Sequence, residues 1–222
     1  MSLILNIDTA LDTASVCLTK DEEALQLTIN KNTKDQGGWL HLTIAEMLEQ
    51  TGYKPTQLNA VAVSIGPGSY TGLRVGLSAA KGLCYALNIP LIAINTLEIM
   101  AFAVKDEAAN LICPMIDARR MEVFTAIYDK SMQEKVSAHA QIIDETSFAA
   151  SLSSSAILFC GTGSKKLQPL ITTPNASFSE TNSNASHLAE LSCNRFRKKQ
   201  FADLAYTEPL YIKEFYTTAR KG

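Results

Sequence analysis

The first half of the chain alternates apolar runs of strand length with segments of helical periodicity. Three short β-type runs separated by polar turns predict antiparallel strands at residues 3–9, 14–19 and 23–30. The pattern then predicts alternating helices and strands, with helices over 39–51 and 71–87, strands at 60–65 and 90–95, and a further helix beginning near Thr96.

A similar but weaker order follows Asn110. It predicts strands at 111–117, 122–129, 136–144 and 156–161, and a short helix over 145–152. The Ser/Thr/Asn-rich run 177–186 predicts a surface loop leading to a helix capped near Ser186. The repeated order predicts an α/β protein built from two mixed sheets with flanking helices. Polar residues at 104–110 place the boundary between domains 1–104 and 105–222, with the last residues expected to pack back on the first domain.

Composition narrows the class of protein. A chain of 222 residues that is 46% hydrophobic can bury a core, and a net charge of −2 gives little basis for independent binding of nucleic acid. The basic residues at 195–199 follow an apolar helical segment and are interpreted as its solvated end. The five cysteines are dispersed and predict free, core-type thiols. No basic leader or membrane-length apolar run is found, so we expect a cytoplasmic protein without membrane contact.

The loop "SIGPGSYTG" at 64–72 lies between a predicted strand and a predicted helix, where phosphate-binding loops also occur. It lacks the lysine and hydroxyl of a P-loop and the third glycine of a dinucleotide fingerprint. The structural alternative is a tight strand-to-helix turn, with Ser69 or Thr71 capping the helix.

The helix after this loop has two apolar seams. The first is Leu73, Leu77, Ala80, Cys84 and Leu87, and the second, of smaller residues, is Val75, Ala79, Gly82 and Ala86. A polar stripe separates them, and the preceding helix is also broadly apolar. One seam must cover the chain's own sheet, whereas the other predicts a helical bundle completed by another protein. Burial by the second domain is the competing explanation. The predicted partner-binding residues are Trp39, Leu40, Ile44, Met47, Leu48, Tyr70, Leu73, Arg74, Leu77, Ala80, Lys81 and Cys84.

Several stretches resemble the TsaB (YeaZ) family, which takes part in the synthesis of N6-threonylcarbamoyladenosine at adenosine 37 of tRNA. They include "LILNIDTALDTASVCL", the long run from "AVAVSIGPGSYTG" to "NTLE", "PMIDARRMEVFTAIYD", "GTGSKK" and "PLYIKEF". The resemblance implies the ASKHA fold of actin-like ATPases, with two duplicated ribonuclease H-like domains. It also implies binding to the catalytic homologue TsaD, recruitment of the ATPase TsaE to the pair, indirect contact with tRNA, and a homodimer when the partner is absent.

The resemblance further implies a chain without catalytic residues or a metal of its own. TsaD-like sequences carry two histidines with three residues between them, and Thr96 and Met100 stand at those positions here. ATP and metal are therefore expected on TsaD and TsaE, with no cofactor bound by this chain alone. Weak candidates for residual nucleotide contacts are Asp8, Thr9, Gly66, Gly68 and Asp117.

Two alternatives remain open from the sequence. An ASKHA-type small-molecule kinase or ATP-dependent transferase would use Asp8 near magnesium and Asp117 as a base. The polar side chains Asp117, Arg119, Arg120 and Glu122 could contact a ligand or form an exposed set of hairpin salt bridges. A metalloprotease is excluded by the missing histidine pair.

Overall fold

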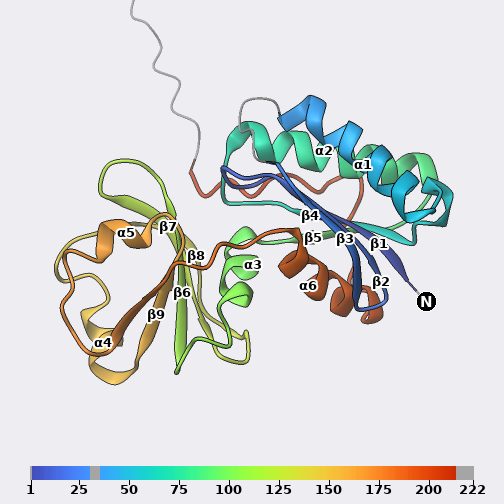
Figure 1. Ribbon diagram of the computed structural model, residues 1–222. Helices are drawn as coiled ribbons and strands as arrows, with labels where there is room; N and C mark the ends of the chain where they lie inside the picture. Colours follow the sequence, from blue (N-terminus) through green and yellow to red (C-terminus); the bar gives the residue numbers. More distant parts are fainter. Residues whose placement is uncertain (1, 31–35, 214–222) are drawn as a thin grey trace, which may run out of the picture.

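Two mixed sheets of five strands each form the framework of the molecule (Figure 1). The computed structural model describes residues 2–30 and 36–213. The strand orders are β3-β2-β1-β4-β5 and β10-β9-β6-β7-β8. In each sheet the three strands that come first in the chain, β1 to β3 and β6 to β8, pair antiparallel. The two later strands, β4 and β5 or β9 and β10, are added in parallel. The predicted duplication and the α/β class are therefore confirmed.

The first half contains most of the elements that the sequence pattern predicts. Its elements are β1 (Leu3–Asp8), β2 (Ser15–Lys20), β3 (Glu23–Ile29), α1 (Gln36–Thr51), the 3-10 helix η1 (Pro55–Gln57), β4 (Ala60–Ser64), α2 (Tyr70–Leu87), β5 (Leu91–Ile94) and α3 (Thr96–Ala103). Strands β1 and β4 are buried along their whole length because helices cover both faces of the sheet.

The second half departs from the predicted pattern in two places. Its elements are β6 (Leu111–Asp117), β7 (Glu122–Asp129), β8 (Glu134–Ile142), α4 (Ala149–Ser154), β9 (Ile157–Cys160), α5 (Ser164–Leu167), β10 (Ala176–Ser179) and α6 (Ala185–Arg197). The loop expected from Ser177 is wrong at its start, because β10 pairs in parallel with β9 there. The helix cap is Asn184, whose side chain accepts from the Ser186 amide.

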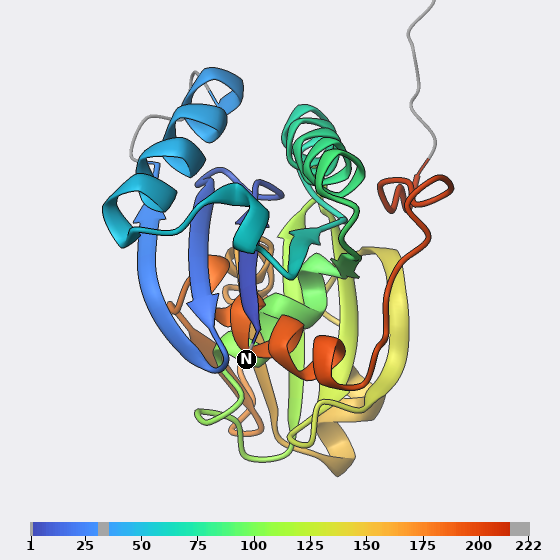
Figure 2. The ribbon, with the colours of Figure 1, turned by 90° about the vertical axis from the view of Figure 1, so that its right-hand side faces the viewer.

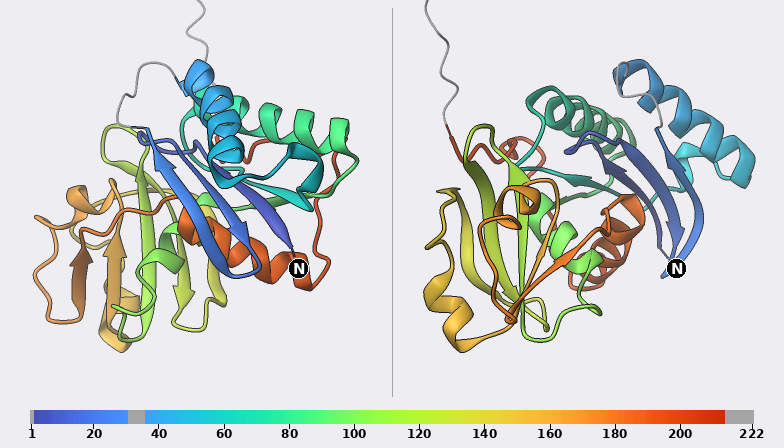
Figure 3. Two further views of the ribbon diagram at one scale, coloured as in Figure 1. Left: turned by 45° about the vertical axis from the view of Figure 1, so that its right-hand side comes forward. Right: turned by 60° about the vertical axis from the view of Figure 1, so that its left-hand side comes forward.

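The helices form layers around the two sheets. Helices α1 and α2 lie side by side on one face of the first sheet, and α6 covers the opposite face (Figure 2). Helix α3 covers the face of the second sheet that is turned toward the first, while α4 and α5 lie on its outer side (Figure 1). Helices α3 and α6 contact each other between the two sheets (Figure 3). The outer side of α1 and α2 is thus turned away from the second sheet.

The C-terminal part of the chain returns to the first sheet. Helix α6 packs on β1, β2, β4 and β5 although it follows the second sheet in sequence. The Ala202 amide then bonds to the Leu91 carbonyl at the β5 edge at 2.8 Å. The predicted return of the last residues extends to 214–222, which lie outside the described residues. The division of the chain at residue 104 stays a prediction.

Candidate partner-binding face and interdomain pocket

One side of α2 belongs to the core of the first domain. Leu73, Leu77, Ala80 and Cys84 are at most 4% exposed, and the last three belong to the core cluster shared with the sheet. Four predicted contact residues of α1, Leu40, Ile44, Met47 and Leu48, are at most 5% exposed and belong to the same core. These eight residues are therefore core residues in the isolated chain, and their contact with a partner stays a prediction. The larger side chains bury more apolar area against the sheet, so their seam is turned inward.

The loop before α2 forms the tight strand-to-helix turn that the sequence analysis gives as the alternative to a phosphate-binding loop. Ser69 caps the helix, and its hydroxyl accepts from the Gly72 amide at 3.2 Å. Asn88 closes the helix in the left-handed conformation, with a φ of 52°. The glycine-rich sequence at the start of α2 thus serves close packing, because a Cβ at Gly76 would lie 2.2 Å from the Thr9 hydroxyl oxygen.

The second seam of α2 is partly open, because Gly82 and Ala86 are exposed whereas Ala79 is 6% exposed and belongs to the core. A groove of about 620 Å³ runs between α1 and α2 and is lined by Gly37, His41, Arg74, Val75, Ser78, Ala79, Gly82 and Leu83. A Cβ added at Gly37 or Gly82 would meet no heavy atom within 4 Å. Small residues therefore leave a shallow channel in which a further helix could approach the backbone closely.

Arg74 and Lys81, the two basic residues among the predicted partner contacts, both make hydrogen bonds within the chain. The Arg74 guanidinium lies 3.9 Å from the centroid of the Tyr70 ring and donates to the Tyr211 hydroxyl at 3.1 Å. The Lys81 ammonium donates to the carbonyls of Ala205 and Thr207, each at 3.1 Å. Trp39 is partly buried against the core. For Trp39, Tyr70, Arg74 and Lys81, contact with a partner stays a prediction.

Three candidate nucleotide residues are enclosed by their own chain. Asp8 is 2% exposed, and its carboxylate accepts from the Ser64 hydroxyl at 2.7 Å and the Ala10 amide at 3.2 Å. Thr9 is fully buried and donates to the Gly72 carbonyl at 2.7 Å. A Cβ at Gly66 would lie 2.8 Å from the Leu210 carbonyl oxygen. Asp8, Thr9 and Gly66 are therefore enclosed in this structure, and their contact with a nucleotide stays a prediction.

Burial also sets the protonation of Asp8. Desolvation raises the pKa of its carboxyl group, although the hydrogen bonds from Ser64 and Ala10 and the nearby His187 oppose the shift. His187 itself accepts the Asn184 amide in the helix-capping arrangement at 3.1 Å. The side chains at the end of β1 thus form an internal polar cluster.

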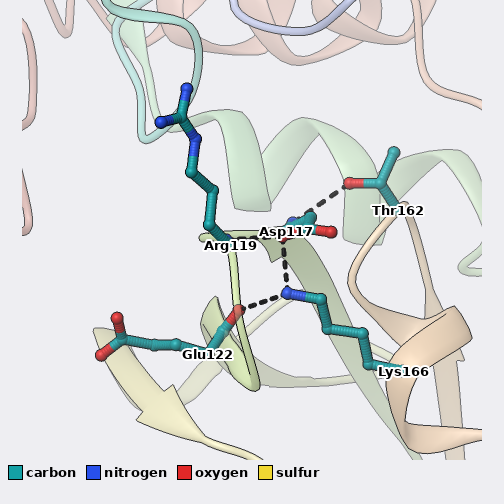
Figure 4. A network of polar contacts seen from close by, with 5 residues as sticks. All are labelled: Asp117, Arg119, Glu122, Thr162 and Lys166. Carbon is teal, nitrogen blue, oxygen red and sulfur yellow. Dashed lines mark hydrogen bonds and ion pairs between the residues drawn. The ribbon is translucent and has the colours of Figure 1, made fainter.

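Asp117, the fifth candidate, is exposed at the end of β6. Its carboxylate accepts from the Lys166 ammonium and from the Arg119 amide, both at 2.6 Å (Figure 4). Desolvation would raise the pKa of Asp117, but these hydrogen bonds outweigh it and lower the pKa. Lys166 also donates to the Glu122 carbonyl at 3.0 Å. The hairpin carboxylates therefore pair with Lys166 of α5 and with Lys213. This differs from the predicted hairpin set, because Arg119 contributes only its backbone amide to the network. A ligand contact of Asp117 stays a prediction.

An apolar pocket of about 360 Å³ lies beside this hairpin, between the two domains. Its lining is Pro67, Gly68, Tyr70, Ala118, Arg119, Phe124, Leu210, Tyr211, Ile212 and Lys213. The Arg119 side chain points away from the Asp117 network (Figure 4). Gly68 is the one candidate nucleotide residue that lines this space, while its own Cβ position is blocked by the Ala10 carbonyl oxygen at 2.1 Å.

Among residues 2–30 and 36–213, no group of three or more His, Cys, Asp or Glu side chains could hold a metal ion. The five cysteines are free and buried, as predicted, and burial raises the pKa of Cys113 to about 12. Within the same residues, no helix has the length and apolar character of a membrane span.

Sequence periodicity missed the C-terminal residues Leu210, Tyr211 and Lys213, which wall the pocket. They have an irregular backbone, so neither a helical nor a strand period marks them. The groove residues Val75, Ala79 and Gly82 were visible as the small-residue seam of α2. The small size of these side chains is the signal that assigns this seam to the face of α2 turned away from the sheet.

The duplicated mixed sheets and the interdomain pocket define an ASKHA-like α/β protein. A family model described as TsaD, tRNA N6-adenosine threonylcarbamoyltransferase, matches residues 34–220. The chain therefore belongs to this family, and within it to the TsaB (YeaZ) proteins of tRNA threonylcarbamoyladenosine biosynthesis.

Curated relatives support this placement over part of their length. The TsaB protein of Bacillus subtilis is 34% identical over 56% of this chain and 54% of its own length. The TsaB protein of Escherichia coli is 34% identical over 57% and 55%. A tRNA N6-adenosine threonylcarbamoyltransferase of Carboxydothermus hydrogenoformans is 34% identical over 51% and 38%. The chain spans about half the length of the TsaB relatives it matches.

Solved structures agree on the fold. YeaZ from Pseudomonas aeruginosa superimposes with a TM-score of 0.83 and 24% identity, covering 95% of this chain and 100% of that one. A second P. aeruginosa structure, described as similar to peptidase YeaZ, gives a TM-score of 0.85 with 24% identity over 96% and 100%. The ASKHA architecture implied by the resemblance is confirmed.

Proposed function

We propose that the chain is a noncatalytic subunit that binds a TsaD-type transferase through the groove between α1 and α2. In this role it supports N6-threonylcarbamoyladenosine modification of tRNA. The observation that carries the proposal is the open small-residue groove on the outer side of α2, within a chain of the TsaB family. A partner helix seated there would cover Val75, Gly82 and Leu83 and complete a bundle with α1 and α2.

The contacts of the described residues support a chain that leaves the transfer reaction to its partner proteins. Asp8 and Thr9 are bonded internally, and the space around Gly66 is filled by Leu210. We assign the ATP, the metal and the transfer step to the partner proteins, with a TsaE-type ATPase joining the pair and tRNA contacted through the complex. A subunit of this kind acts by binding one state of the transferase more tightly than the other. A kinase would need an open phosphate site, so we do not adopt that alternative.

Filling the groove tests the proposal. Leucine at Gly82 would occupy open space, and it would favour the helix because glycine costs about 1 kcal/mol relative to alanine in a helix interior. We expect Gly82→Leu to weaken binding to the TsaD-type partner at least about tenfold in titration calorimetry while the melting temperature is kept or raised.

A matched control is Ala150→Leu, an equally exposed helical position on α4 in the other domain. The control should bind as the native chain does. Native affinity in a folded Gly82→Leu chain would refute the groove as the docking site.

A further inference from the structure

The segment 201–213 connects elements of both domains by side-chain and backbone contacts. It begins beside the β5 edge, where the Ala202 amide bonds to the Leu91 carbonyl at 2.8 Å. It continues along α2, where Lys81 holds the carbonyls of Ala205 and Thr207. Figure 2 shows this segment running beside α2 on the side away from α1.

The far end of the segment reaches the second domain. The Leu210 amide donates to the Ile65 carbonyl at 2.7 Å, just before the loop that precedes α2. The Tyr211 ring lies 5.3 Å from that of Tyr70. The Lys213 ammonium then contacts both carboxylate oxygens of Glu122 on β7, at 2.5 and 2.6 Å.

These contacts are few and mostly at the surface. The segment contains no helix or strand beyond the single bridge at Ala202. The Lys213–Glu122 pair is 47% and 21% exposed, so it stabilises only weakly. Segments held in this way open locally without global unfolding.

The same segment supplies one wall of the interdomain pocket. Residues 210–213 line it opposite Ala118, Arg119 and Phe124 of the second domain. Without this wall the pocket would be an open surface. Its existence therefore depends on the position of the segment.

We propose that residues 201–213 form a C-terminal clasp, a locally opening element that ties the β6–β7 hairpin to α2 and whose closure forms the interdomain pocket. Opening releases Tyr211 from Tyr70 and Arg74, and it removes the pocket wall. Lys81 and Arg74 belong to α2, the helix that lines the groove. The clasp therefore joins the second domain to the side of α2 that is turned away from α1. This inference concerns the isolated chain and does not depend on the identity of a partner.

Hydrogen exchange of the isolated chain tests the clasp, with the Leu210 amide as reporter. Lys213→Gln removes the ion pair at the far end and should speed Leu210 exchange about two- to fivefold. Lys81→Met removes the middle anchor and should speed it about tenfold. Both variants should also lose part of the mutual ring-current shifts of Tyr70 and Tyr211.

Two controls separate the clasp from general loosening. Lys135→Gln removes a comparable surface pair, Lys135–Asp129 at 2.8 Å, on the β7–β8 hairpin, and should leave Leu210 unchanged. The Val61 amide, which bonds to the Pro90 carbonyl in the first sheet, should exchange at the native rate in all variants. Leu210 exchange that is native-like in Lys213→Gln, or that rises only together with Val61, would overturn the proposal. Glu122→Gln provides a second test of the same ion pair.

Discussion

Asp8 shows how one residue can keep an acidic group and serve a structural role. Its carboxyl group lies at the buried end of β1 and accepts two internal hydrogen bonds, from Ser64 and Ala10. Burial nevertheless raises its pKa above that of the unfolded chain. In the folded protein the group therefore binds a proton more readily than in the unfolded chain, so its contribution to stability is greatest in acid and is lost as the pH rises through the folded pKa.

Replacing this carboxyl group by an amide should remove that pH dependence. Asp8→Asn keeps an oxygen that can accept from Ser64 and Ala10 but has no charge to desolvate. Around pH 8, we expect the variant to exceed the native chain in unfolding free energy by about 1–3 kcal/mol, with the difference shrinking toward pH 4. Urea denaturation across this pH range measures it.

Asp144 provides a control of opposite sign. Hydrogen bonds from Thr146 and Ser147 lower the pKa of this exposed carboxyl group. Its stabilising contribution is present above the unfolded pKa and is lost in acid, so Asp144→Asn should not gain stability as the pH rises. For Asp8 itself, an Asn variant less stable than the native chain at pH 8 would contradict the prediction. It would mean that the hydrogen bonds to the Asp8 carboxylate outweigh its desolvation.

At the scale of elements, α2 has two faces with opposite tolerance of charge. Ala80 is fully buried against the sheet, whereas Ala86 is exposed on the same helix. Ala80→Glu should therefore cost about 3 kcal/mol or more, because an unpaired carboxylate would enter the core. Ala86→Glu should change the unfolding free energy by no more than about 0.5 kcal/mol.

Thermal and urea unfolding of the two variants check this assignment. Equal tolerance of both charges would contradict the orientation of α2. A loss of partner binding in Ala80→Glu would carry no information about the interface, because the fold itself is damaged.

The elements differ in how far their sequences predict them. Strands β1 to β3 are predicted because each is an apolar run of strand length bounded by polar turns, and α2 is predicted because its apolar residues recur at helical spacing. Strand β10 has only the polar run Ala176–Ser179 and exists because β9 offers it a parallel edge. The sequence also does not decide which seam of α2 faces the sheet. Two seams of comparable apolarity compete for the sheet, and the outcome depends on side-chain volume against neighbours that the helix sequence does not contain.

At the scale of the whole molecule, the layering leaves one helical face uncovered. Helices α3 and α6 contact each other between the sheets, while α1 and α2 lie on the far side of the first sheet (Figures 1 and 3). The second domain therefore does not cover the small-residue seam, so the competing explanation from the sequence is wrong. Leu42 of α1, which follows the groove residue His41 in sequence, is 66% exposed.

This uncovered face predicts self-association when no partner is present. A two-fold pair would let each groove receive the helices of a second copy, in an interface that closes on itself. We expect sedimentation velocity of the native chain to show a concentration-dependent dimer, and Leu42→Lys to shift it toward monomer by at least about tenfold in dissociation constant. Ile142→Lys is the matched control, since Ile142 is an apolar residue that is 70% exposed on β8 of the other domain. A dimer lost in the control but kept in Leu42→Lys would place the contact on the second sheet and contradict the groove.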